Sequence, residues 1–213
     1  IAGFSLSFAD TIGYQTASVE AVLGIPMRVF GNLLVGFILF GAALHVTGAG
    51  RFFTNVSMAL LGNVRGGTAK VAVVASGLFG TMSGSSVSNV LATGVVTIPA
   101  MKRTGFRPED AAAVEANASS GGVLTPPVMG AVAFVMASVL GTPYVYVAAA
   151  AAVPAFLFYL SLFLQIDAYA AKYGIRGLPR QELPSLRESV REGWFYMLAF
   201  GLLLFLLVYL RQE

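Results

Sequence analysis

The chain has 213 residues, of which 57% are hydrophobic and only 11% are charged, and its mean hydropathy is +0.79. Soluble domains usually carry about 25% charged residues, so this composition excludes an ordinary soluble globular protein and predicts a membrane protein. The lack of cysteine in the sequence excludes a disulfide-stabilised secreted scaffold. The net charge of +3 is more typical of basic loops flanking membrane spans than of nucleic-acid binding.

The sequence starts at Ile1, without an initiating methionine or a signal-peptide pattern, and we interpret it as part of a longer polypeptide. Residues 1–25 are predicted to end a preceding segment. The first complete apolar run, 26–47, is long enough to cross a bilayer as a helix. The mixed apolar and polar run 51–64 predicts a helix at the membrane interface. Residues 26–64 are thus interpreted as a scaffold helix followed by an interfacial arm helix.

Residues 65–101 consist of two apolar arms that meet at the Gly- and Ser-rich sequence 80–89. The second arm, 90–101, has 12 residues and would span roughly 18 Å as a helix, which is too short for a hydrocarbon core of about 30 Å. Basic residues flank both ends of the segment, and a full crossing would place them on opposite sides of the membrane. The sequence therefore predicts a re-entrant helical hairpin that enters and leaves from the cytoplasmic side.

A second interrupted segment covers residues 108–140. The run 119–127 breaks the helical pattern with glycines and with adjacent prolines, which cannot donate backbone hydrogen bonds to the preceding turn. Within a bilayer, non-helical backbone is tolerated only where it is buried in protein or lines a water-filled cavity. The sequence therefore predicts a broken transmembrane helix, which forms a transport domain with the hairpin over residues 65–140.

Residues 141–213 are predicted to contain further transmembrane helices, at 144–166 and 193–210, joined by a cytoplasmic loop at 167–192. The distribution of basic residues gives the orientation. Only Arg28 and Arg211 of the thirteen basic residues fall outside three loops, which the positive-inside rule places in the cytoplasm. These loops are 48–72, 102–107 and 167–192.

The two interruptions bring together groups suited to binding a small cation and an anion. Hydroxyl, amide and carbonyl oxygens are hard neutral ligands for an alkali cation, and the N-termini of half-helices direct partial positive charge towards an anion. Close helix packing by small residues is the alternative interpretation. The predicted ion- and substrate-binding residues of the hairpin tip are Ser83, Gly84, Ser85, Ser86 and Asn89. Those of the helix break are Ser119, Ser120, Gly121, Gly122, Thr125 and Pro126.

Glu115 is an acidic residue about two turns inside the predicted broken helix. Ionisable residues within a membrane are functional hypotheses by default. A proton or ion role and a structural role both stay open for Glu115 from the sequence. His45, the only histidine of the sequence, is interpreted as a structural residue near a helix end.

Five ordered runs of the sequence carry a family resemblance: 65–72, 76–89, 97–106, 113–122 and 126–134. The first three resemble the large membrane subunit of tripartite ATP-independent periplasmic (TRAP) transporters. The last two resemble its TAXI branch, in which the two membrane subunits are often fused. The resemblance extends over residues 36–177, and a set of ordered motifs is more specific than one short pattern.

The resemblance implies an elevator-type secondary transporter, in which a mobile domain carries the substrate past a fixed scaffold. It also implies that an extracytoplasmic substrate-binding protein delivers a small organic acid anion, and that a sodium or proton gradient drives uptake. The coupling ion is the only cofactor expected, with sodium at the hairpin tip and the helix break. The other implied partners are a small membrane subunit or its fused equivalent, the second half of the same permease and the lipid bilayer, with no nucleic acid.

The expected fold class is an all-α membrane protein, the half of an elevator-type secondary transporter that contains a re-entrant helical hairpin and a broken transmembrane helix. The family's second inverted repeat has no counterpart in this sequence, so the chain resembles the first-repeat half. The expected location is the bacterial or archaeal cytoplasmic (inner) membrane, as a multi-pass protein. No catalytic residue is predicted.

Two other functions stay open from the sequence. One is a structural or channel-forming membrane domain, and a channel would conduct without alternating access. The other, less well supported, is an intramembrane serine protease using Ser83. A serine nucleophile needs an adjacent base, and His45 is predicted near the cytoplasmic face whereas Ser83 is predicted at mid-membrane.

Overall fold

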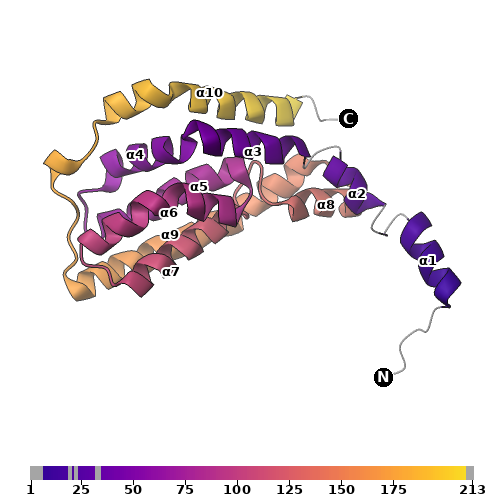
Figure 1. Ribbon diagram of the computed structural model, residues 1–213, viewed down its shortest axis with the longest axis horizontal. Coiled ribbons are helices and arrows are strands. Elements are labelled where there is room, and N and C mark those ends of the chain that lie inside the picture. Colours follow the sequence, from indigo (N-terminus) through magenta and orange to yellow (C-terminus); the bar gives the residue numbers. More distant parts are fainter. Residues whose placement is uncertain (1–6, 19–20, 22–23, 32–34, 210–213) are drawn as a thin grey trace.

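The computed structural model describes residues 7–18, 21, 24–31 and 35–209. These residues form ten α-helices and one short 3-10 helix, and the part of the chain that the structure describes contains no strand. Most of the helices run alongside one another in an elongated bundle (Figure 1). The all-α prediction is therefore confirmed for the described residues.

The N-terminal third contains α1 (Phe8–Ala17), α2 (Ile25–Val29), α3 (Val35–Thr47) and α4 (Ala49–Leu61). In Figure 1, α1 projects from one end of the bundle. The predicted span 26–47 includes α2 and α3, and because residues 32–34 lie outside the described residues, a single continuous span there stays a prediction. Gly48 separates α3 from α4 with a left-handed φ of 94°, a conformation that favours glycine.

Helix α4 has one apolar face and one polar face. Its apolar side chains Phe52 and Phe53 join Phe79 of α5 and Tyr196 of α10 in one buried cluster. Helix α10 seats closely here, since a Cβ on Gly193 would lie 2.1 Å from the Phe52 ring. Figure 1 shows α4 running alongside α5 and α10, in continuation of α3. The interfacial position of residues 51–64 stays a prediction.

Helices α5 (Gly67–Ser83) and α6 (Ser86–Arg103) form an antiparallel helical hairpin. The Thr68 and Thr104 hydroxyls lie 2.7 Å apart, so both arms end at the same end of the bundle. The predicted short second arm is wrong: α6 has 18 residues, or about 27 Å, because the turn is confined to two residues. The length of the second arm therefore does not support a re-entrant position of the hairpin, and this position stays a prediction.

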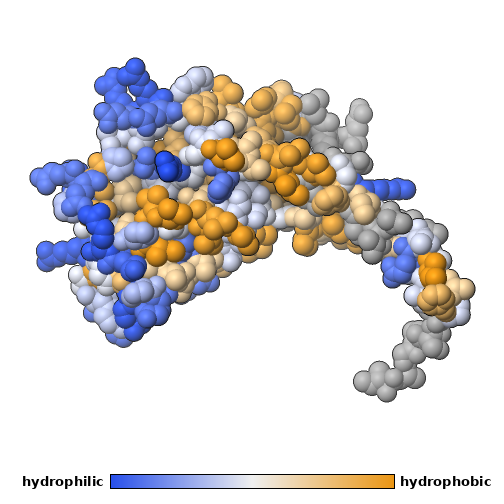
Figure 2. Space-filling view, in the orientation of Figure 1, coloured by the Kyte–Doolittle hydropathy of each residue, from blue (hydrophilic) through white to orange (hydrophobic). Residues whose placement is uncertain are grey.

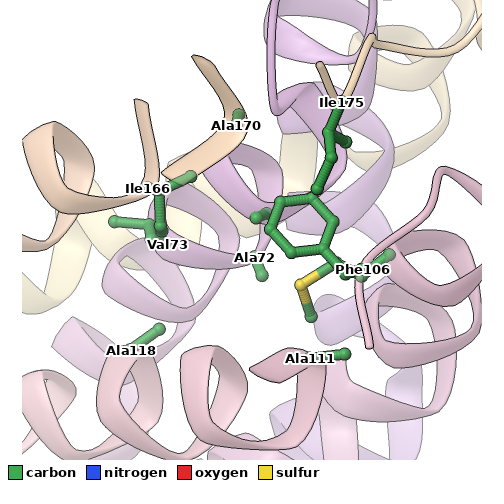
Figure 3. Packing of buried hydrophobic residues seen from close by; sticks show 10 residues of the cluster. Ala72, Val73, Phe106, Ala111, Ala118, Ile166, Ala170 and Ile175 are labelled. Atoms are coloured by element: carbon green, nitrogen blue, oxygen red, sulfur yellow. The ribbon is translucent and has the colours of Figure 1, made fainter. Parts of the chain in front are cut away.

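Helix α7 (Pro108–Gly122) packs along the hairpin, and α8 (Ala131–Leu140) follows it. One buried cluster joins α5, α7 and α9. In Figure 3, Phe106 and Ile175 lie close to each other, among the small side chains of Ala72 and Ala111. Alanine at these positions allows the helix backbones to approach closely, as is usual for helices packed within membranes.

The C-terminal part contains α9 (Tyr144–Tyr173), the 3-10 helix η2 (Arg180–Glu182) and α10 (Leu186–Tyr209). Two segments of the described chain, Tyr144–Tyr173 and Arg180–Leu206, are long and apolar enough to span a membrane. The predicted loop 167–192 is too long, because α9 continues seven residues past Ile166 and α10 begins at Leu186. Both helices therefore continue beyond their apolar parts, through polar residues at their ends. Ser185 caps α10 by accepting a hydrogen bond from the Glu188 N–H at 3.4 Å.

Hydrophilic residues gather at one end of the bundle, and apolar residues cover much of its middle (Figure 2). The base of the hairpin and the end of α9 meet at this polar end. There Asp167 accepts hydrogen bonds from Arg65 and from the largely buried Lys70, whose ammonium group lies 4.8 Å from the centre of the Phe163 ring. This distribution supports the positive-inside interpretation, and the orientation in a membrane stays a prediction.

Replacing Lys70 by Met should lower the free energy of unfolding by about 1–3 kcal/mol, because it removes one partner of a partly buried ion pair. The side chains of Lys70 and Asp167 are 7% and 31% exposed. The control is Arg103→Met, which breaks the pair with Glu182, where the side chains are 69% and 45% exposed; this should cost about 0–1 kcal/mol. Thermal unfolding in detergent checks both. Equal losses of stability from the two substitutions would show that the Lys70–Asp167 ion pair does not hold the hairpin against α9.

Candidate functional site

The turn at the tip of the hairpin consists of Gly84 and Ser85. Gly84 has a left-handed φ of 58°, and its N–H donates to the Gly80 carbonyl at 3.0 Å, which closes α5. Ser85 caps α6 by accepting a hydrogen bond from the Ser88 N–H at 3.3 Å. The interruption is thus much shorter than the predicted run 80–89, because helix capping satisfies the backbone on both sides of the turn.

The break between α7 and α8 covers residues 123–130. Helix α7 continues through Ser119 to Gly122, so the predicted start of the break at Ser119 is wrong. The Pro126–Pro127 peptide bond is cis, and Met129 adopts a positive φ of 54°. The buried Tyr144 hydroxyl at the start of α9 lies 2.7 Å from the Pro127 carbonyl oxygen and 2.8 Å from that of Val128. Tyr144 thereby places one hydroxyl donor between two carbonyls that the helix no longer pairs.

The hairpin tip and the helix break are in direct contact. The Val128 N–H donates to the Thr81 carbonyl at 3.1 Å. A Cβ on Gly84 would lie 2.0 Å from the Met129 carbonyl oxygen, so only glycine allows the two backbones to approach this closely. The sequence predicted these interruptions separately, and the structure places them against each other.

The helices that lead to the two interruptions also cross closely, at Gly80 and Gly122. A Cβ on Gly80 would lie 2.4 Å from the Gly122 Cα atom. The Asn89 amide lies beside this crossing and donates to the Ser76 carbonyl at 2.7 Å. Asn89 is fully buried, so it braces the hairpin behind its tip.

Glu115 lies one turn before Ser119, at the centre of the contact between α5, α6 and α7. Its carboxylate is completely buried. Oε1 accepts hydrogen bonds from the hydroxyls of Ser76 at 3.0 Å, Thr93 at 2.5 Å and Ser119 at 3.2 Å. Oε2 accepts one from Thr97. We call Glu115 and these four hydroxyls the Glu115 cage.

The predicted tip residues differ in exposure. Ser85 is exposed at the turn, Ser86 and Gly84 are half-buried, and Asn89 is fully buried. The hydroxyl oxygen of Ser83 is buried and has no hydrogen-bond partner among the described residues. The tip residues are therefore adjacent, but they do not all face one point.

The predicted break residues separate into two groups. Ser119 and Gly122 are buried against the hairpin, whereas Ser120 is exposed and donates to the Ala116 carbonyl of its own helix. Gly121 instead packs on α9, where its Cβ would lie 2.5 Å from the Phe158 ring. Thr125 donates to the Gly121 carbonyl at 2.8 Å. The remaining predicted residue, the half-buried Pro126, belongs to the cis peptide bond.

Sequence reasoning missed the hydroxyls of Ser76, Thr93 and Thr97. Thr93 and Thr97 are four residues apart on α6, which places them on one face of the helix. A hydroxyl face on an apolar helix, beside an intramembrane acid, is a recognisable signal for a polar cluster. The missing information was which helices pack against Glu115, namely α5 and α6.

A largely apolar groove of about 680 Å³ lies between the break, α8 and α9. Its lining includes Leu124, Met136 and Tyr146 and none of the predicted ion- and substrate-binding residues. The described residues contain no cluster of three or more His, Cys, Asp or Glu side chains placed to hold a metal. The described part of the site therefore offers oxygen ligands, such as the carboxylate and hydroxyls of the Glu115 cage.

The family model described as "Tripartite ATP-independent periplasmic transporter, DctM component" matches residues 2–213. The chain belongs to this family. The match confirms the resemblance to the TRAP large permease, and assignment to the TAXI branch stays a prediction. Family membership also makes the chain part of a transmembrane transport protein.

Curated relatives support the same assignment. The C4-dicarboxylate TRAP transporter large permease protein DctM of Pseudomonas aeruginosa is 30% identical over 195 residues, covering 92% of this chain and 42% of the relative. The ectoine/5-hydroxyectoine TRAP transporter large permease protein UehC of Ruegeria pomeroyi is 31% identical over 192 residues, covering 89% and 43%. The isethionate TRAP transporter permease protein DctMQ of Oleidesulfovibrio alaskensis is 29% identical over 122 residues, covering 57% and 18%.

The chain thus spans about two fifths of the length of the DctM and UehC large permeases. This coverage is consistent with the predicted half-length fragment. The names of these relatives describe permeases, which agrees with the prediction that the protein is not an enzyme.

Replacing Gly80 by Ala should lower the free energy of unfolding by about 1–3 kcal/mol, because the new methyl group forces α5 away from α7. Gly77→Ala on the same helix is the control, since its Cβ would lie 3.4 Å from the Tyr159 ring, at ordinary contact distance. Both changes alter helix propensity equally, so the difference reports the crossing. Thermal unfolding in detergent that gave equal stabilities would contradict the close approach of the two helices.

Proposed function

We propose that this chain is the part of a TRAP-type large permease that contributes one half of an ion-coupled transport site. The observation that carries the proposal is the direct contact between the hairpin tip and the helix break, with Gly84 against Met129. Interrupted helices that meet inside a helical bundle are typical of the binding sites of secondary transporters. The finding that the chain belongs to a transporter family supports this interpretation of the contact.

The coupling ion in this proposal is sodium or a proton, and the substrate is a small organic acid anion. The named relatives act on C4-dicarboxylates, ectoines and isethionate, which are small, polar compounds carrying ionised groups. Exposed Ser85 and half-buried Ser86 at the start of α6 offer hydroxyl oxygens and a helix N-terminus to such ligands. An extracytoplasmic binding protein delivers the substrate, and a small membrane subunit or its fused equivalent and the second half of the permease complete the transporter.

Transport in this proposal follows an elevator mechanism in the bacterial or archaeal inner membrane. Helices α5, α6 and α7 pack extensively against one another and share the Glu115 cage, so they suit a unit that moves as one body. Helix α10 contacts mainly α4, which suits a scaffold. The re-entrant placement of the hairpin and the multi-pass topology are parts of the same proposal.

The alternative functions have less support. A protease would need a base beside its serine, but Ser83 has no hydrogen-bond partner among the described residues and the His45 side chain is exposed. A channel would use the same oxygens without alternating access, so it requires a direct test.

Replacing Ser85 by Leu should abolish most ion-dependent substrate uptake by the full-length permease in proteoliposomes with its binding protein, because the side chain blocks the exposed tip. Ser138→Leu makes the same exchange on an exposed position of α8 and should leave uptake close to the unsubstituted level. Unchanged, ion-dependent uptake by the Ser85 variant would remove the tip from the transport site.

A cysteine at Ser86 distinguishes a carrier from a channel. This chain contains no cysteine, so Ser86→Cys introduces the one label site of this part of the permease. Alternating access predicts that a membrane-impermeant thiol reagent labels it from one side at a time, and that the reactive side changes with ion and substrate. Simultaneous labelling from both sides, unaffected by ligands, would favour a channel.

A further inference from the structure

Glu115 is a buried carboxylate without a cationic partner among the described residues. The ion pairs of the described chain involve Asp110, Asp167 and Glu182, and the donors to Glu115 are neutral hydroxyls. Tyr159 of α9 donates its hydroxyl to the Ala118 carbonyl instead. Burying an ionised group costs several kcal/mol unless an opposite charge compensates it. A cation bound in the Glu115 cage would supply the missing opposite charge.

Three of the four hydroxyls of the Glu115 cage gather around Oε1. The hydroxyl oxygens of Ser76, Thr93 and Ser119 all lie within 3.2 Å of this atom, and each comes from a different helix. A Cβ on Gly94 would lie 3.2 Å from Glu115 Cγ, so glycine at this position lets α6 approach the carboxylate. One carboxylate and several hydroxyls form a hard oxygen ligand set.

This ligand set selects against most protein-bound metals. The described residues offer no group of three His, Cys, Asp or Glu side chains, which zinc and other transition metals prefer. Calcium sites commonly use several carboxylates, and magnesium dehydrates reluctantly. A single negative charge with neutral oxygens matches the charge of one monovalent cation.

Each hydroxyl of α6 in the cage has a second acceptor within hydrogen-bond distance. Thr93 lies 2.9 Å from the Asn89 carbonyl oxygen, and Thr97 lies 3.1 Å from the Thr93 carbonyl oxygen. Each hydroxyl carries one proton, so it donates either to Glu115 or to the backbone. Donation to the backbone turns the proton away from Glu115, so the hydroxyl oxygen can face a cation bound to the carboxylate.

We propose that Glu115 and the hydroxyls of Ser76, Thr93 and Ser119 bind a sodium-sized monovalent metal cation, about two helical turns below the contact between the hairpin tip and the helix break. The binding of the cation is inferred from the residues of the Glu115 cage alone. The role of the cation in transport rests on the proposed function. The bound cation neutralises Glu115 and draws α5, α6 and α7 together. Through Ser119 and Asn89, it thereby sets the positions of the break and the tip.

Thermal unfolding of the full-length protein in detergent tests the site without any transport assay. The melting temperature is measured at fixed pH in sodium, potassium or choline chloride of equal ionic strength. Sodium should raise the melting temperature of the unsubstituted protein, because a ligand that binds only the folded state stabilises it. Glu115→Gln should lose most of this rise. Glu109→Gln removes the same charge from the exposed first turn of α7 and should keep it.

Ser119→Ala provides a second variant if Glu115→Gln does not fold, and it should shift the sodium response to higher concentration. A full sodium response in every one of these variants that folds would show that the Glu115 cage is not a cation site. So would a protein that responds to pH but not to sodium, which would make the occupant a proton. A sodium response that depends on Glu115 in a protein without uptake in proteoliposomes would refute the transport function and leave the cation site standing.

Discussion

A completely buried carboxylate imposes the strongest physical constraint on this protein. Glu115 has to be surrounded by donors, because an unsatisfied charge in an apolar helical bundle is costly. The donors come from α5, α6 and α7, so satisfying Glu115 fixes how the hairpin packs on the broken helix. Directional hydrogen bonds from three helices to one carboxylate help to specify the register of this packing.

Glycine makes this arrangement sterically accessible. The helix backbones touch at Gly80 and Gly122, and the tip touches the break at Gly84. These contacts bring the two interruptions together at one end of the shared polar cluster. Tyr144 then brings one hydroxyl donor to two carbonyls of the break from the start of α9. The result is non-helical backbone that is stabilised by protein on several sides, which is the condition for its presence in a bilayer.

Local chemistry explains which features could be predicted from the sequence. Gly84 and the Pro126–Pro127 pair mark real interruptions, because their backbone conformations are incompatible with a continuing helix. Ser119 was misinterpreted as the start of a break, since serine and glycine are tolerated inside a helix when tight packing favours them. Composition likewise could not show that the ends of α9 and α10 extend as helices beyond their apolar parts.

The remaining features depend on which helices are neighbours. Nothing local in the sequence says that Thr93 and Ser76 face Glu115, because that contact joins residues far apart in the chain. The same is true of the clamp between Lys70 and Asp167. Family resemblance gave the correct family, but it did not locate the acid at the centre of the cluster.

The central claim is that the hairpin tip and the helix break respond to a cation as one unit joined through Glu115. Hydrogen–deuterium exchange of the full-length protein in detergent measures this most directly, by comparing sodium with potassium at equal ionic strength and fixed pH. Our account predicts that sodium slows amide exchange together in residues 84–86 and in residues 123–130. Slower exchange in only one of these segments, or in neither, would contradict it.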